Sequence, residues 1–242
     1  MELDKIYLGD CIELMKGIPD KSIDLVVTDP PYLLDNQGGG FWSKAKDGNH
    51  YNARGTRKGM DKLSPIKDGI ETEILDELYR VMKKTNIYLF CSQKQIPVLI
   101  EFFAEGHGCN WNLLSWHKTN PIPACGNKYL NDTEYIMFFR EKGVKLYGSY
   151  DTKRTFYTSL RNQEDNVKYE HPTVKPLNII KNLIINSSME GDVVLDPFCG
   201  SGTTCVAAAQ LGRHYIGMEI DKKYHRIACE RVKNELAQLT LF

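Results

Sequence analysis

Short, almost continuously apolar runs alternate along the chain with stretches in which apolar residues recur at helical spacing. The runs at 23–28 and 86–91 have the pattern typical of strands buried on both faces. Residues 71–84 carry their apolar side chains on one helical face. The same criteria predict strands at 6–9, 23–28, 86–91, 111–116, 135–139, 193–195 and 214–218, and helices at 11–17, 71–84, 95–105, 177–188, 203–211 and 221–239.

This alternation of strands and helices predicts an α/β fold of the doubly wound type, with a mostly parallel sheet covered on both faces. Pro176, a residue favoured where helices begin, should lead the helix at 177–188, and Asp221 should be the N-cap of the last helix. Two stretches lack an apolar period. Residues 33–70, which contain three consecutive glycines, are predicted to be a mobile loop insertion, and residues 140–170 are predicted to be polar and irregular.

Composition narrows the class of protein. A chain of 242 residues with 42% apolar and 26% charged residues fits one globular domain. Its apolar stretches are far shorter than the roughly 20 residues of a membrane span, and its polar N-terminus is unlike a signal peptide. The seven cysteines are scattered without a Cys-x-x-Cys pair, so we expect reduced thiols and no metal site. These features predict a cytoplasmic protein without a membrane partner.

Charge is balanced overall but unevenly distributed. The formal net charge is zero, which counts against a protein that binds nucleic acid by electrostatic attraction alone. Lysine and arginine nevertheless outnumber aspartate and glutamate in the two irregular stretches, 33–70 and 140–170. Any contact with a polyanion is therefore expected in these loops.

The first segment with specific chemistry is Asp29-Pro30-Pro31-Tyr32, which follows the apolar run at 23–28. Asp29 offers a carboxylate, Pro30 offers a carbonyl without an N–H, and Tyr32 offers a flat ring. Two acceptors beside an aromatic face suit a planar amino group. A strand followed by a proline-stiffened turn is the structural alternative for the same residues.

A second segment, 196–204, follows a strand and opens a helix with the turn Gly200-Ser201-Gly202. Glycines allow close approach of a ligand, and a helix N-terminus offers free N–H groups. About twenty residues on, Glu219 ends a strand, where an acid can accept ribose hydroxyls. Cys205 breaks the dinucleotide pattern Gly-x-Gly-x-x-Gly, and no P-loop follows. Together, the glycine turn and Glu219 predict a cofactor with one nucleoside and an amino-acid tail.

These two segments occur together with His171-Pro172-Thr173-Val174-Lys175-Pro176. With all three in this order, the chain resembles the S-adenosylmethionine-dependent amino-methyltransferases of DNA, in the permuted group called the beta class. The resemblance implies a single methyltransferase domain over 1–242. It also implies a seven-stranded sheet, six strands parallel and one antiparallel, in which 111–116 and 135–139 form the edge. Asp29 and Asp196 would then end adjacent central strands.

The resemblance assigns S-adenosylmethionine as the cofactor and implies its contacts. Asp10 would accept the exocyclic N–H of the cofactor's adenine, and Glu219 would hold its ribose. Thr173 and Lys175 would reach its carboxylate. The full set implied at the cofactor is Asp10, Cys11, Asp29, Thr173, Lys175, Asp196, Pro197, Phe198, Gly200, Ser201, Gly202, Thr203, Glu219 and Ile220.

The implied reaction is methyl transfer to an exocyclic amino group of a base flipped out of double-stranded DNA. Asp29 and the Pro30 carbonyl would accept hydrogen bonds from that amino group, Pro31 would stiffen the turn, and Tyr32 would stack on the base. Asp at the first position favours N6 of adenine, and N4 of cytosine is the alternative. Residues 33–70 would close over the site, and residues 140–170 would recognise the target sequence. The cations expected on DNA are Arg54, Arg57, Lys58, Lys153, Arg154 and Arg161.

Other readings stay open at this point. RNA and protein-glutamine methyltransferases share the chemistry, but they more often carry Asn at the position of Asp29. A nicotinamide-dependent oxidoreductase is disfavoured by Cys205. A DNA-binding module that has lost catalysis would not need the intact tetrapeptide. By analogy, a homodimer and a cognate restriction endonuclease are the expected protein partners.

Overall fold

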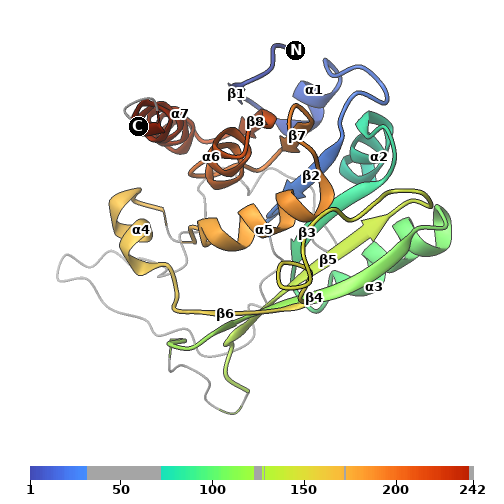
Figure 1. Ribbon diagram of the computed structural model, residues 1–242, viewed down its shortest axis with the longest axis horizontal. Helices are drawn as coiled ribbons and strands as arrows, with labels where there is room; N and C mark the ends of the chain where they lie inside the picture. The colour runs from blue at the N-terminus through green and yellow to red at the C-terminus, as the bar shows by residue number, and fades with distance from the viewer. Residues whose placement is uncertain (32–71, 123–126, 128, 172, 240–242) are drawn as a thin grey trace.

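The computed structural model describes residues 1–31, 72–122, 127, 129–171 and 173–239. Within these residues the chain forms one eight-stranded sheet in the order β1-β8-β7-β2-β3-β5-β4-β6 (Figure 1). The strands are β1 (Lys5–Leu8), β2 (Leu25–Thr28), β3 (Asn86–Cys91), β4 (Asn110–Lys118), β5 (Thr133–Arg140), β6 (Phe156–Ser159), β7 (Val193–Asp196) and β8 (His214–Glu219). The insertion predicted at 33–70 lies outside the described residues.

Five neighbouring strands, from β1 to β3, run parallel, and β5 is the one described strand that runs against the others. The expected single antiparallel strand is therefore confirmed, as is the central pairing of β2 with β7. The strand count differs from the seven that we predicted. Residues 156–159 add β6, which pairs parallel with β4 and takes its place at the edge of the sheet.

Residues 140–170 are therefore more regular than predicted, because they contain β6 and a short helix, α4 (Gln163–Lys168). The side chains of β6 alternate between exposed and half-buried, so an apolar pattern is missing. Backbone pairing and one side-chain bond hold this strand in place. The Trp116 indole N–H donates to Ser159 Oγ at 2.8 Å.

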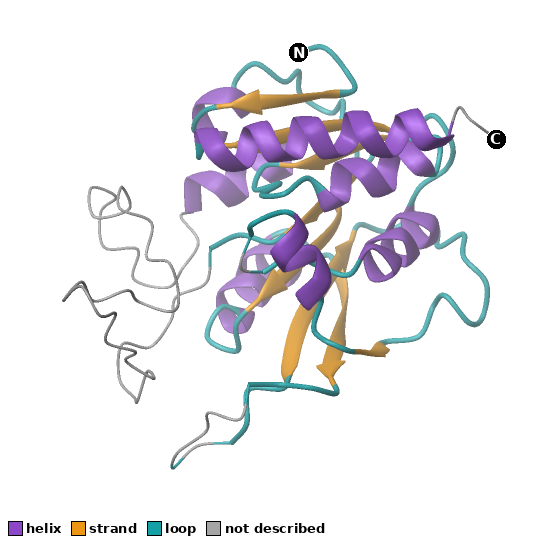
Figure 2. Ribbon diagram, turned by 90° about the vertical axis from the view of Figure 1, so that its left-hand side faces the viewer, coloured by secondary structure: helices purple, strands orange, loops and turns teal. Residues whose placement is uncertain are grey.

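Helices cover both faces of the sheet (Figure 2). One face packs against α1 (Cys11–Met15), α2 (Thr72–Val81), α3 (Ile96–Leu99) and the π-helix η2 (Ile100–Gly106). The other packs against α5 (Leu177–Ser187), α6 (Thr203–Gln210) and α7 (Lys222–Leu239). The doubly wound α/β fold is thus confirmed. The helix predicted at 95–105 is split in two where the hydrogen-bond spacing widens.

Two helix starts were predicted by residue. Asp221 accepts the backbone N–H groups of Lys223 and Tyr224 at 2.8 and 3.1 Å, which confirms it as the N-cap of α7. Pro176 leads α5 as predicted, and it occupies the N-cap position directly before Leu177.

Parallel register brings the ends of four strands to one edge of the sheet, called here the carboxyl edge. Leu8 of β1 pairs with Glu219 of β8, and Val26 of β2 pairs with Leu195 of β7. The antiparallel strand β5 starts at this edge, with Tyr135 opposite Cys91. Open α/β sheets bind ligands at the carboxyl ends of their strands. No helix among the described residues is long and apolar enough to cross a membrane.

Candidate functional site

Asp29 follows β2 directly and lies at the carboxyl edge. One of its oxygens, Oδ2, forms an ion pair with the ammonium of Lys175. The other, Oδ1, is buried and has no hydrogen-bond partner among the described residues. A buried acceptor without a partner costs free energy unless a ligand supplies a donor. Asp29 thus presents one anchored oxygen and one oxygen available to an N–H group.

Lys175 is buried and links Asp29 to a second acid, Glu134, at the start of β5. Its Nζ lies 3.3 Å from Glu134 Oε2 and 5.1 Å from the centre of the Phe90 ring. Burial would lower the pKa of Lys175, but Asp29 and Glu134 outweigh burial and raise that pKa. Lys175 therefore stays charged.

Glu134 is itself held between two cations. Lys118, at the end of β4, lies 2.5 Å from Glu134 Oε1. Burial would raise the pKa of Glu134, but Lys175 and Lys118 lower it below its ordinary value. Neither Glu134 nor Lys118 was singled out by the sequence. The available signal was topological, because an antiparallel strand begins where its parallel neighbours end.

The rest of the tetrapeptide is only partly described. Pro30 is buried, and the carbonyl of Pro31 accepts a long hydrogen bond of 3.5 Å from Gln95 Nε2. Gln95 also accepts from the backbone N–H of Ser92 at 2.8 Å, so the turn after β3 supports the turn after β2. Tyr32 lies outside the described residues.

Asp196, at the end of β7, lies beside the tetrapeptide. Its Oδ1 accepts from Thr28 Oγ1 at 2.8 Å and from the Phe198 N–H at 3.1 Å. Burial raises the pKa of Asp196 to about 6, although the hydrogen bonds from Thr204, Thr28 and Phe198 oppose that shift. The prediction that Asp196 and Asp29 end adjacent strands is confirmed.

The raised pKa of Asp196 has a consequence for stability. Between about pH 4 and pH 6 the folded state keeps a proton that the unfolded state has lost, so stability falls as pH rises. At 1.36 kcal/mol per pKa unit, the free energy of unfolding falls by about 3 kcal/mol between pH 4 and pH 6 because of this group. Asp196→Asn should remove this slope, because the asparagine amide does not titrate, and its oxygen can still accept from Thr28 and Phe198. Urea unfolding at pH 4, 5, 6 and 7 measures the effect, and parallel slopes in the two proteins would contradict it.

The glycine turn and Glu219 meet at the same edge. The N–H of Gly200 donates to Glu219 Oε2 at 3.0 Å, and the N–H of Asp221 donates to Oε1 at 2.9 Å. Gly200 has a φ of +52°, and an added Cβ would lie 3.0 Å from His171 Nε2. Glycine is therefore required where the segments 171–176 and 196–204 touch. Pro197 connects Asp196 to the turn.

The remaining residues predicted at the cofactor surround this turn. Asp10 uses Oδ1 to cap α1, accepting from the N–H groups of Ile12 at 3.0 Å and Glu13 at 3.2 Å. Beside it Cys11 is buried, whereas Ile220 is 55% exposed next to Glu219. The N–H of Thr173 donates to His171 Nδ1 at 3.3 Å.

Arg231 of α7 is a further residue of this site that sequence reasoning missed. Its side chain is buried, and Nη1 donates to Thr203 Oγ1 at 2.8 Å, to Ser201 Oγ at 3.2 Å and to the Ser201 carbonyl at 3.3 Å. Its guanidinium lies 4.1 Å from the centre of the Tyr169 ring. Arg231 thus fastens both sides of Gly202 to the last helix. This contact arises because α6 packs against α7, and no sequence motif predicts it.

Of the cations predicted on DNA, the three that the structure describes are not brought together. Arg161 follows β6 at the carboxyl edge, where its Nε donates to the Asn120 carbonyl at 2.8 Å. Arg154 pairs with Asp151 before β6 begins, and Lys153 adjoins it, so these two lie toward the opposite edge. Arg54, Arg57 and Lys58 lie outside the described residues.

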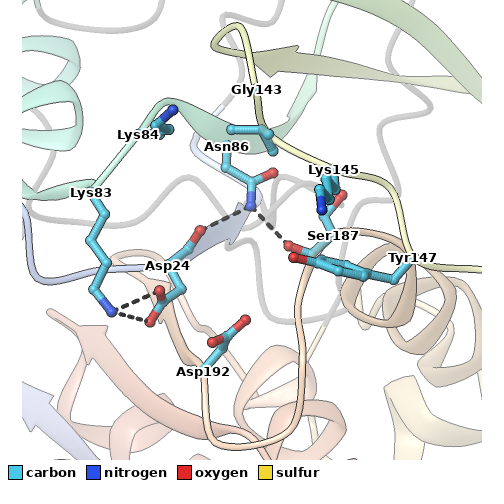
Figure 3. Close-up of a pocket in the computed structure, with 10 residues that line it drawn as sticks. Asp24, Lys83, Lys84, Asn86, Gly143, Lys145, Tyr147, Ser187 and Asp192 are labelled. Carbon is cyan, nitrogen blue, oxygen red and sulfur yellow. Dashed lines mark hydrogen bonds and ion pairs between the residues drawn. The ribbon is translucent and has the colours of Figure 1, made fainter.

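A cavity of about 300 Å³ opens at that opposite edge, where Asp24 precedes β2 and Asn86 begins β3. Figure 3 shows residues that line it. Two of its charged groups bind each other: Lys83 Nζ lies 2.7 and 2.9 Å from the two carboxylate oxygens of Asp24. Asn86 Nδ2 donates to the carbonyls of Asp24 and Ser187, both at 2.9 Å. The hydrogen bonds around this cavity stabilise the ends of β2, β3 and α5. In the described part of the chain, no three His, Cys, Asp or Glu residues gather where they could hold a metal ion.

Comparison with known proteins is consistent with this geometry. A family described as DNA methylase, covering N6 and N4 enzymes, matches residues 23–230. Type II methyltransferase M.HinfI of Haemophilus influenzae is 32% identical, over 96% of this chain and 68% of that protein. Type II methyltransferase M2.MboI of Moraxella bovis is 28% identical, over 96% of this chain and 91% of that protein.

Solved structures share the fold. The M1.HpyAVI–SAM complex aligns with a TM-score of 0.66 and 24% identity, over 94% of this chain and 98% of that one. The cytosine-N4-specific PvuII DNA methyltransferase aligns with a TM-score of 0.68 and 17% identity, over 97% and 91%. The family match, spanning most of the chain, confirms the resemblance drawn from the three sequence segments. The chain belongs to the N6/N4 DNA methylase family, the S-adenosylmethionine-dependent amino-methyltransferases of DNA.

Proposed function

We propose that this protein transfers a methyl group from S-adenosylmethionine to N6 of an adenine flipped out of double-stranded DNA. One observation carries the proposal. Asp29 has an anchored oxygen and a buried oxygen without a partner, at the edge where parallel strands end. An exocyclic amino group would supply the missing donor.

The cofactor supplies an activated methyl group on a sulfonium, so the chain's task is alignment and stabilisation of charge on nitrogen. Asp29 Oδ1 and the Pro30 carbonyl would accept the two N–H groups of the target. These bonds favour a pyramidal nitrogen whose lone pair points at the methyl carbon. As the C–N bond formed and the methyl–sulfur bond broke to leave a neutral thioether, the Asp29 carboxylate would offset the positive charge on nitrogen. The surplus proton would afterwards pass from the nitrogen to water.

The residues at the carboxyl edge fit the cofactor. Glu219 accepts the backbone N–H groups of Gly200 and Asp221, which fix its carboxylate at the end of β8, where it would hold the ribose of the cofactor. The glycine turn leads into α6, whose N-terminus favours a carboxylate. Asp10 would contact the adenine and Thr173 the carboxylate. Because the Lys175 ammonium lies against Asp29, we assign it to that acid rather than to the cofactor.

Adenine is the preferred base because the resemblance associates Asp at the position of Asp29 with N6 enzymes. Cytosine N4 is the alternative, because the PvuII enzyme, which shares the fold, is cytosine-N4-specific. Tyr32 would stack on the flipped base. Residues 33–70, with Arg54, Arg57 and Lys58, would close over it. Residues 140–170 would recognise the target sequence, with Arg161 at the site and Lys153 and Arg154 farther away. A homodimer, a cognate endonuclease and a cytoplasmic location remain predictions.

The test uses purified protein, mixed-sequence duplex DNA and S-adenosylmethionine with a labelled methyl group. Digestion to nucleosides followed by mass spectrometry identifies the modified base. We expect labelled N6-methyl-2′-deoxyadenosine and no labelled N4-methyl-2′-deoxycytidine. Label in N4-methyl-2′-deoxycytidine would replace the adenine assignment. An absence of cofactor binding by calorimetry would contradict the proposal as a whole.

A further inference from the structure

The acid at the start of β5 has no role in the reaction described so far. We propose that Glu134 is a positioning residue for methyl transfer, which holds Lys175 on one oxygen of Asp29 and so leaves the other oxygen to the target amino group. This inference rests on the proposed function, and it adds a residue outside the three sequence segments.

The first argument is the line of alternating charges. Lys118, Glu134, Lys175 and Asp29 follow one another, with 2.5 Å between Lys118 Nζ and Glu134 Oε1 and 3.3 Å between Lys175 Nζ and Glu134 Oε2. The side chains of Lys175 and Glu134 are 8% and 16% exposed. Charges so poorly hydrated are stable only when each has an opposite partner. Glu134 is the member that two cations share.

The second argument concerns which oxygen of Asp29 is occupied. Lys175 is the cation paired with Oδ2, and Oδ1 is left without a partner among the described residues. An ammonium facing a single carboxylate can move between its two oxygens, because Lys is a compact charge with rotatable donors. The pull of Glu134 from β5 and the Phe90 ring restrict that movement.

The same groups predict a change in pH dependence. The charged groups around Lys175 are Asp29, which follows β2, and Glu134 on β5, which in turn binds Lys118 on β4. Two further titratable groups, Asp196 and the Cys91 thiol, lie near Asp29. Glu134→Gln removes one of two carboxylates that keep Lys175 protonated. The pKa of Lys175 should therefore fall. Because only the charged ammonium pairs with Asp29, we expect activity to be lost at a lower alkaline pH in Glu134→Gln than in the wild-type protein.

The experiment measures single-turnover methyl transfer on duplex DNA and cofactor affinity by calorimetry for Glu134→Gln. We expect the rate to fall about tenfold to a hundredfold, as for misplaced reacting groups, with little change in cofactor affinity. The matched control is Glu141→Gln, just beyond the other end of β5, where the carboxylate accepts only weakly from the Thr85 N–H at 3.3 Å. Its rate should equal that of the wild-type protein.

Because Glu134→Gln removes the carboxylate partner of Lys118, the double variant Lys118→Gln/Glu134→Gln separates positioning from stability. We expect the double variant to be more thermally stable than Glu134→Gln. Its rate of methyl transfer should stay low, and it should still lose activity at a lower alkaline pH than the wild-type protein. A wild-type rate in either variant would overturn the inference, since Glu134 would then only neutralise Lys118. Failure of the wild-type protein to methylate DNA would instead contradict the proposed function.

Discussion

Asp29→Ala should lower the rate of methyl transfer by about a thousandfold, an effect at the upper end for removing one preorganised polar group from a reacting centre. Alanine takes away the acceptor of the target N–H and the negative charge that stabilises the developing cation on nitrogen. The loss should fall on the chemical step. Binding of S-adenosylmethionine should change far less, because the glycine turn and Glu219 are held by other contacts.

Asp29→Asn is the matched variant, since it keeps the shape and one acceptor oxygen but removes the charge. Its amide would leave Lys175 with Glu134 as its described carboxylate partner, so we expect a rate between those of the wild-type and alanine proteins. Single-turnover transfer of a labelled methyl group gives the rate, and calorimetry gives cofactor affinity. A rate for Asp29→Ala within about tenfold of the wild-type rate would contradict the prediction, because Asp29 would then contribute little to stabilising the charge on nitrogen.

Arg231→Met should have the second largest effect, and it should act on the cofactor site and on stability together. Methionine can fill much of the space of the arginine side chain but donates no hydrogen bond. The Thr203 hydroxyl and the Ser201 carbonyl would lose a charged donor in a buried place. The free energy of unfolding should fall by about 3 kcal/mol, the cost of losing buried hydrogen bonds to a charged group.

The same change should weaken S-adenosylmethionine binding about tenfold, because a cost of 1.4 kcal/mol in holding the turn is a factor of ten in affinity. Arg231→Lys is the control: it keeps the charge but cannot reproduce the planar fork or its stacking on Tyr169, so partial loss is expected. Urea unfolding and calorimetric titration measure both effects. Unchanged affinity in a destabilised Arg231→Met protein would show that Arg231 serves the fold alone.

The fold was predictable wherever burial leaves a pattern in the sequence. The strand at 86–91 has the predicted bounds, because all six of its residues are buried and apolar residues dominate it. The strand β6 was missed because it lies at the edge with half of its side chains exposed, and backbone pairing holds it. Within 95–105 the sequence predicted a helix but not the change to π spacing at Ile100. Such a change depends on packing rather than on local pattern.

The site divides in the same way. Asp29, Asp196 and Glu219 were predictable as neighbours, because each follows or ends a parallel strand and the sheet gathers such ends at one edge. Glu134 and Arg231 were not predictable, because neither belongs to a motif. Glu134 reaches the site on an antiparallel strand, and Arg231 reaches it through the packing of the last helix. The partnership of Lys175 with Asp29 also required the structure, since a motif gives a residue's place along the chain but not the direction of its side chain.

The most direct test of the account is modified-base sequencing of DNA from a host that expresses this chain, beside the same host expressing Asp29→Ala. The account predicts N6-methyladenine at one position of a short recurring sequence in the first DNA, and none at that sequence in the second. Methylation of cytosine N4, or N6-methyladenine that persists with Asp29→Ala, would contradict it.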